Sequence, residues 1–136
     1  MILVDTSVWV DFLWGIDTPA RSAVRELISR RFDELVICEP IVMELMAGAT
    51  DAAALDRIQQ LADGLPTLHV DPLLDFRAAA ALYRPARSGG ETVRSIVDCL
   101  IAAVALRHDV RLVHKDRDFE VLGRITGLRH RSYRSM

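Results

Sequence analysis

The chain opens with a short apolar run, residues 2–4 (Ile-Leu-Val), that leads directly into Asp5. Such a run predicts a buried strand, and the helical spacing of apolar residues over 8–13 predicts a helix straight after it. In an open parallel sheet, ligands bind beyond the carboxyl ends of the strands. Asp5 is therefore expected at an edge of the sheet where a ligand could bind.

Short strands and helices alternate along the rest of the chain. Apolar runs at 35–37, 67–70 and 111–114 predict three more strands, and the C-terminal end holds at most a short edge strand. Helices are expected over about 19–31, 40–47, 52–63, 71–86 and 95–105, with one or two helical turns over 116–122. This alternation predicts an α/β fold: a three-layer α/β/α domain with a short, mainly parallel central sheet of four to five strands.

The composition fits one folded domain spanning residues 1–136. Hydrophobic residues make up 51% of the chain and charged residues 26%, which is typical of a globular protein. No apolar run is long enough to cross a bilayer, and no signal peptide precedes the first strand, so we expect a cytoplasmic protein without membrane contact. Cys38 and Cys99 lack CxxC spacing and stand in apolar runs, which predicts reduced, buried thiols.

The formal net charge of −2 argues against a large basic surface for nucleic acid. It leaves a local one open, because the segment after Gly123 carries four arginines and no acid.

Four acids occupy comparable positions, each after a predicted strand or on a helix that follows one. They are Asp5, Glu44, Asp98 and Asp116. Parallel strand ends and helix starts at one edge can bring them together, and crowded carboxylates raise one another's pKa unless a cation neutralises them. Carboxylate oxygens suit Mg²⁺ or Mn²⁺ rather than zinc, and such an ion can activate water beside a phosphoryl group.

Each acid also has a purely structural interpretation. Asp5 could cap the helix that follows it, and Glu44 could be a solvated helix residue. Asp98 could complete a capping box, and Asp116 could cap the turn beginning near Asp118. The joint placement of the four acids, rather than any one of them, favours a metal site.

Other chemistries fit less well. The sequence has no GxSxG, P-loop or GxGxxG motif. Phosphatases with an aspartyl nucleophile need a second acid two residues after the first, where this chain has Ser7. The histidines lack the spacing of a zinc site and are interpreted as structural or surface residues. They are His69, His108, His114 and His130.

Four segments, taken in order, carry a family resemblance: residues 2–7 (ILVDTS), 39–44 (EPIVME), 98–103 (DCLIAA) and 114–119 (HKDRDF). Together they resemble the motifs of a PIN domain, and more narrowly those of the VapC toxins of bacterial toxin–antitoxin systems. The resemblance implies a PIN-like fold and a Mg²⁺-dependent ribonuclease, with Mn²⁺ as a substitute, that cuts structured RNA such as tRNA. It also implies a homodimer and a cognate VapB-type antitoxin that occupies the toxin's groove.

The resemblance also assigns roles to single residues. The catalytic metal site would consist of the four acids named above, with Asp118 as an outer acid and Thr6 or Ser7 orienting Asp5. Where the family often has Thr or Ser two residues before the last acid, this chain has His114. The alternative is a non-catalytic PIN-like module that binds RNA or protein and keeps an idle acidic pocket.

The first helix is unusually rich in large apolar side chains. Either all four of them belong to the core, or Phe12 or Trp14 faces an antitoxin segment. The four are Trp9, Phe12, Leu13 and Trp14.

Overall fold

Five parallel strands form the centre of the computed structural model, which describes residues 1–88 and 91–135. The strand order is β3-β2-β1-β4-β5, so the N-terminal strand is the central one. The predicted short parallel sheet of four to five strands is therefore confirmed. The strands are β1 (Ile2–Val4), β2 (Leu35–Cys38), β3 (Thr67–Leu68), β4 (Arg111–His114) and β5 (His130–Ser132).

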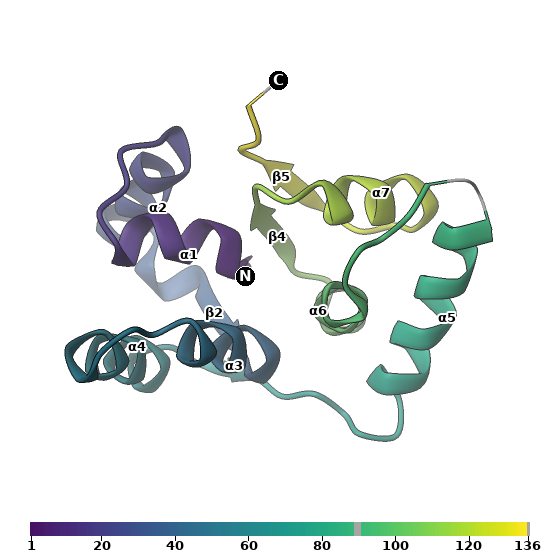
Figure 1. The fold of residues 1–136 in the computed structure, drawn as a ribbon, viewed down its shortest axis with the longest axis horizontal. Helices are drawn as coiled ribbons and strands as arrows, with labels where there is room; N and C mark the ends of the chain where they lie inside the picture. Colours follow the sequence, from purple (N-terminus) through teal and green to yellow (C-terminus); the bar gives the residue numbers. More distant parts are fainter. Residues whose placement is uncertain (89–90, 136) are drawn as a thin grey trace.

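Helices flank this sheet on both sides, which confirms the three-layer α/β/α prediction. Figure 1 shows α1 to α4 on one side of the strands and α5 to α7 on the other. Within the described part of the chain, no helix is long and apolar enough to cross a membrane. The helices are α1 (Thr6–Leu13), α2 (Pro19–Arg30), α3 (Glu39–Ala47), α4 (Ala52–Gly64), α5 (Asp75–Ser88), α6 (Ile96–His108) and α7 (Arg117–Ile125), with a 3-10 turn at Phe32–Glu34.

Burial follows from this layering. All residues of β1 and β2 are buried, as expected for strands covered on both faces, and this explains why they read as continuous apolar runs. Helix α6 is buried along most of its length. Cys38 and Cys99 are buried free thiols, as predicted.

Helix α5 begins at Asp75 and not at Asp71, so the predicted start was wrong. The Asp71 carboxylate accepts the backbone N–H groups of Leu73 and Leu74, as a helix cap does. Its carbonyl accepts the N–H groups of Leu74 and Asp75, so residues 72–74 form a turn that leads into the helix.

Two other predicted boundaries also shift. Strand β3 ends at Leu68 rather than at Val70, because the Val70 N–H donates to the Glu39 carboxylate instead of to a neighbouring strand. Helix α7 runs on to Ile125, beyond the predicted end at residue 122, and its apolar side packs into the core.

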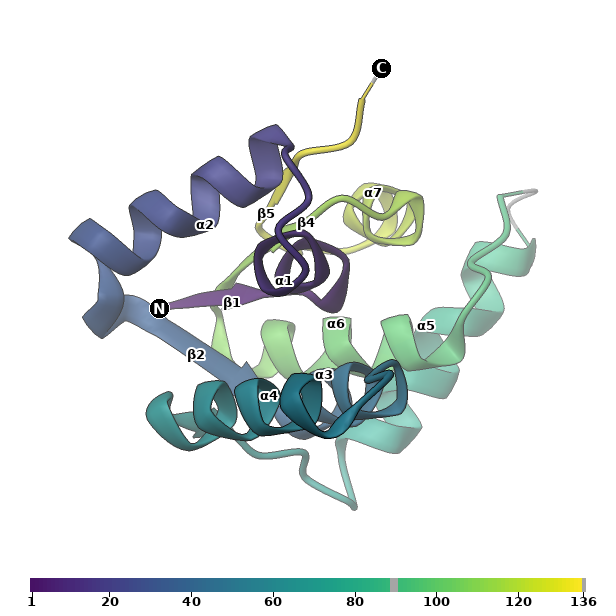
Figure 2. The ribbon, with the colours of Figure 1, turned by 60° about the vertical axis from the view of Figure 1, so that its left-hand side comes forward.

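The parallel arrangement brings the carboxyl ends of the strands to one edge of the sheet. Figure 2 shows β1 leading into α1 and β2 leading toward α3 in the same general direction. Because β4 pairs directly with β1, the residues after Val4 and His114 lie beside each other. The backbone N–H of Asp5 donates to the carbonyl of Val113 across this pair at 2.9 Å.

Candidate metal site

Asp5 caps helix α1 with one carboxylate oxygen and leaves the other free. Its Oδ2 accepts the backbone N–H of Ser7 at 3.0 Å and the Ser7 hydroxyl at 2.6 Å. Its Oδ1 is buried and has no hydrogen-bond partner among the described residues. Capping therefore explains only half of this carboxylate, and a buried oxygen without a partner is costly unless something binds it.

Glu44 reaches the same place from helix α3. Its Oε1 accepts the Thr6 hydroxyl at 2.7 Å, which fixes a side chain that is only half-buried. The two neighbouring hydroxyls thus serve different acids: Ser7 holds Asp5, and Thr6 holds Glu44 rather than Asp5.

Asp98 stands in the first turn of α6, but it does not complete the predicted capping box. A capping box would require its carboxylate to accept the Ser95 N–H, and that donor bonds to Asp118 Oδ2 at 3.1 Å instead. Ser95 itself caps the helix by accepting the Val97 N–H. The Asp98 side chain is therefore buried without a capping role.

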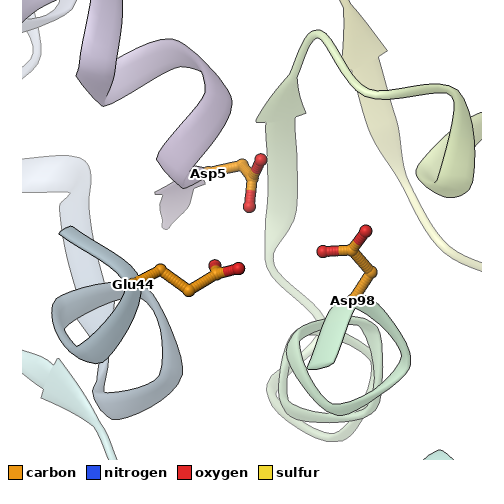
Figure 3. A group of neighbouring side chains, drawn as sticks. All are labelled: Asp5, Glu44 and Asp98. Atoms are coloured by element: carbon orange, nitrogen blue, oxygen red, sulfur yellow. The ribbon is translucent and has the colours of Figure 1, made fainter. Parts of the chain in front are cut away.

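The carboxylates converge in two groups that share Asp98. Oxygens of Asp5, Glu44 and Asp98 lie within 4.8 Å of one another, and Figure 3 shows the three side chains pointing into a common space. Oxygens of Asp98, Asp116 and Asp118 also lie within 4.8 Å of one another. The structure thus brings the four predicted acids together through Asp98, and it places Asp118, predicted as an outer acid, in the second group.

Backbone N–H groups at the starts of α6 and α7 hold Asp116 and Asp118 in place. Asp116 caps α7 and accepts the Asp118 N–H at 2.9 Å. Asp118 is almost completely buried and accepts the N–H groups of Arg94 and Ser95, at 3.0–3.1 Å. Asp118 therefore ties the start of α6 to α7.

Burial and the neighbouring acids raise the pKa of Asp5, Glu44 and Asp98, which favours their neutral forms. Burial raises the pKa of Asp5 to about 6, opposed by the Ser7 hydrogen bonds and reinforced by the charges of Glu44 and Asp116. Burial likewise raises the pKa of Glu44, and Asp116 adds to that shift. The pKa of Asp98 lies far above its usual range because of burial first, and then because of its hydrogen bond to the Asp118 carboxyl.

The chain's only lysine does not relieve this repulsion. The Lys115 ammonium pairs with the buried carboxylate of Asp11 on α1, which also accepts the Thr18 hydroxyl. The Lys115 backbone N–H donates to Ser7 Oγ at 3.1 Å, so the residues after β4 are bonded to the Ser7 that orients Asp5.

These residues fit a hard divalent cation such as Mg²⁺ or Mn²⁺. The candidate ligands are all carboxylates, two groups of oxygens lie close enough to share an ion, and Asp5 Oδ1 has no hydrogen-bond partner in the described part of the chain. Neither group of candidate ligands found in the described residues includes a histidine or a cysteine, which argues against zinc.

Sequence reasoning assigned no site role to His114, which bonds the Asp116 backbone, or to His130, which bonds His114. His114 is fully buried, and its Nδ1 accepts the Asp116 backbone N–H at 3.1 Å. Its Nε2 lies 2.9 Å from Nδ1 of His130 on the neighbouring strand. The one available signal was the position of His114, two residues before the last acid.

The raised pKa of Asp5 predicts how metal-free stability changes with pH. The folded state holds this proton more tightly than the unfolded chain, so the stabilisation is complete below the unfolded pKa of 3.8 and is lost as the pH rises through about 6. In EDTA, wild type should lose on the order of 1 kcal/mol relative to Asp5→Asn between about pH 5 and about pH 8. Urea unfolding at each pH measures the difference, and parallel curves for the two proteins would contradict it. With Mg²⁺ present the trend should reverse, because only ionised carboxylates bind the ion.

Comparison with known proteins agrees with this geometry. The PIN domain family matches residues 2–125. The chain is 51% identical over 134 residues to VapC ribonuclease Mb1587 of Mycobacterium bovis and to ribonuclease VapC11 of Mycobacterium tuberculosis, which covers 98% of this chain and 100% of each relative. The chain therefore belongs to the PIN-domain family, and within that family it belongs with the VapC ribonucleases.

A solved structure shows the same fold at lower identity. VapBC2 from Rickettsia felis, bound to a DNA fragment from its promoter, matches with a TM-score of 0.72 at 17% identity, over 98% of this chain and 99% of that chain. The family model and the VapC relatives thus confirm the resemblance that the sequence motifs indicated, and the solved structure agrees with it in fold.

Proposed function

We propose that this chain, as a single PIN domain, is a divalent-metal-dependent endoribonuclease and the toxin of a toxin–antitoxin pair. The observation that carries the proposal is the convergence of Asp5, Glu44, Asp98 and Asp116 around a buried Asp5 oxygen that no described residue bonds. The 51% identity to VapC ribonucleases over nearly the whole chain supports an RNA substrate. We place the substrate among structured cellular RNAs such as tRNA, and the protein in the cytoplasm.

The residues have distinct roles in this proposal. Asp5 and Asp98 hold the ion, Mg²⁺ by preference, and Glu44 and Asp116 complete its surroundings directly or through water. Ser7 orients Asp5 through two hydrogen bonds. When bound, the cation would activate water and offset the negative charge that develops on the phosphate.

Hydrolysis forms a bond from the water oxygen to phosphorus and breaks the bond to the 3′ oxygen. The products are therefore a 5′-phosphate and a 3′-hydroxyl. A 2′,3′-cyclic phosphate would instead show attack by the RNA's own 2′-hydroxyl and would reject hydrolysis by activated water.

Incubation of the purified chain with total tRNA, in Mg²⁺ and separately in EDTA, tests the proposal. We expect cleavage only with Mg²⁺, and end mapping should find the products named above. RNA that binds and shifts in a gel but stays uncut in Mg²⁺ and Mn²⁺ would favour the non-catalytic PIN-like module.

The toxin assignment also implies partners, a VapB-type antitoxin and a second copy of this chain. The structure divides the large side chains of α1 between core and surface: Trp9 is fully buried, Phe12 and Leu13 pack on the core, and Trp14 is 36% exposed. The interpretation of all four as core residues is therefore wrong for Trp14. We propose that Trp14 contacts the antitoxin.

Trp14→Ala should weaken antitoxin binding by about tenfold, since exposed tryptophans are frequent anchors of interfaces. The measurement is antitoxin affinity by calorimetry, together with the melting temperature of the free toxin. Unchanged affinity with a lowered melting temperature would assign Trp14 to internal packing and reject the contact. Phe32→Ala, at another exposed aromatic outside α1, is the matched control.

A further inference from the structure

The hydrogen bonds of His114 define where its proton lies. Nδ1 accepts the backbone N–H of Asp116, so Nδ1 carries no proton. A neutral imidazole has one N–H, which is therefore on Nε2 and is donated to Nδ1 of His130 at 2.9 Å. His130 must in turn keep its own proton on Nε2, because its Nδ1 accepts.

The surrounding fold holds both rings in this arrangement. His114 packs against Phe119 of α7, with ring centroids 5.2 Å apart. His130 lies over Gly123 of the same helix, where an added Cβ would come within 2.4 Å of the His130 ring. A helix position without a side chain thus makes room for the His130 ring, which accepts the hydrogen bond from His114.

Two contacts fix Asp116 at the start of α7. His114 accepts its backbone N–H, and its own Oδ1 accepts the N–H of Asp118 at 2.9 Å. These bonds set the position of the peptide and the rotation of the side chain. The carboxylate is thereby presented next to Asp98, with which it forms one of the two candidate ligand groups.

We propose that His114 and His130 are a positioning pair for the metal site. His130 selects the tautomer of His114, and the unprotonated Nδ1 of His114 then holds Asp116 in place for the cation. The inference rests on the proposed function, because it takes Asp116 as part of the metal site. Among the contacts of the described residues, neither ring bonds to a candidate ligand carboxylate, so His114 acts through the Asp116 backbone and His130 acts through His114.

Asparagine and glutamine separate the two ring nitrogens experimentally. In His114→Asn, the side-chain oxygen takes the place of Nδ1 and still accepts the Asp116 N–H. In His114→Gln, the amide nitrogen takes the place of Nε2, and no acceptor stands at Nδ1. Both changes remove the ring, so the loss of packing against Phe119 is matched.

Calorimetric titration with Mg²⁺ should distinguish the two variants of the full-length chain. We expect His114→Gln to bind Mg²⁺ about tenfold more weakly than wild type, and His114→Asn to stay within about threefold of it. In RNA cleavage kcat should follow the same order, while KM for RNA stays unchanged in both.

A double-mutant cycle tests the part played by His130. His130→Gln removes the acceptor at Nδ1 and should weaken Mg²⁺ binding when His114 is present. In the His114→Asn background the same change should have no effect, because no donor remains at the Nε2 position. Additive effects would show that His130 acts through packing and would overturn the pair.

Long-range ¹H–¹⁵N spectra read the tautomers of the intact protein without metal or RNA. We expect an unprotonated Nδ1 in both rings. A proton on His114 Nδ1, or equal Mg²⁺ affinities for His114→Asn and His114→Gln, would overturn the inference. Wild-type protein with the expected tautomers that neither binds Mg²⁺ nor cuts RNA would instead overturn the proposed function, and with it the role of the pair at a metal site.

Discussion

Asp98→Asn should lower the rate of RNA cleavage by on the order of a thousandfold or more. It should leave the metal-free fold at least as stable as wild type, with a gain of up to about 1 kcal/mol in the free energy of unfolding. Asp98 is the acid shared by both groups of candidate ligands, so its charge matters most for binding the cation. Without metal, ionised Asp98 destabilises the folded state, since burial and Asp118 raise the pKa of Asp98. The Asn amide keeps an oxygen and can donate to Asp118 as the protonated acid does.

Melting curves in EDTA and in Mg²⁺ measure both halves of this prediction. Mg²⁺ should raise the melting temperature of wild type, because it binds the folded state, and should raise that of Asp98→Asn much less. Asp56→Asn, at an exposed acid on α4, controls for the substitution itself. If Asp98→Asn melts well below wild type in EDTA and still gains fully from Mg²⁺, Asp98 is structural and the site must be redrawn around the other three acids.

Asp118→Ala, unlike Asp98→Asn, should destabilise the metal-free protein, by about 2–4 kcal/mol. The Asp118 carboxylate accepts the N–H groups of Arg94 and Ser95 at the entry to α6 and is itself almost completely buried. Alanine would leave these donors without their acceptor, and Asp98 would lose its hydrogen-bond partner. Urea unfolding in EDTA gives the free energy directly.

A cap of similar chemistry but simpler surroundings provides the comparison. Asp51 is exposed and accepts one N–H, from Ala54, at the start of α4. Asp51→Ala should therefore cost only about 1 kcal/mol. Equal losses for Asp51→Ala and Asp118→Ala would mean that Asp118 is an ordinary helix cap and that its burial between α6 and α7 contributes nothing.

Much of the fold was predictable because its signals are local in sequence. The run at residues 2–4 predicted β1, and the helix expected from about residue 19 begins at Pro19, after the Thr18 cap. The positions of Asp5 and Asp116 after strands followed from the same pattern. A local signal misled at the start of α5, where Asp71 caps a turn over residues 72–74 and the regular helix begins only at Asp75.

The sequence by itself determined the order of the elements, the parallel sheet and the four acids, since periodicity, caps and strand ends involve neighbours in the chain. Only the tertiary structure decided which distant segments hold the acids beside one another. Lys115 meets Ser7 across 108 positions, Arg94 meets Asp118 across 24, and His114 meets His130 across 16. These contacts depend on the strand order and on how α6 and α7 pack. No local pattern encodes them, because each needs two distant segments to be folded against each other before the hydrogen bond can form.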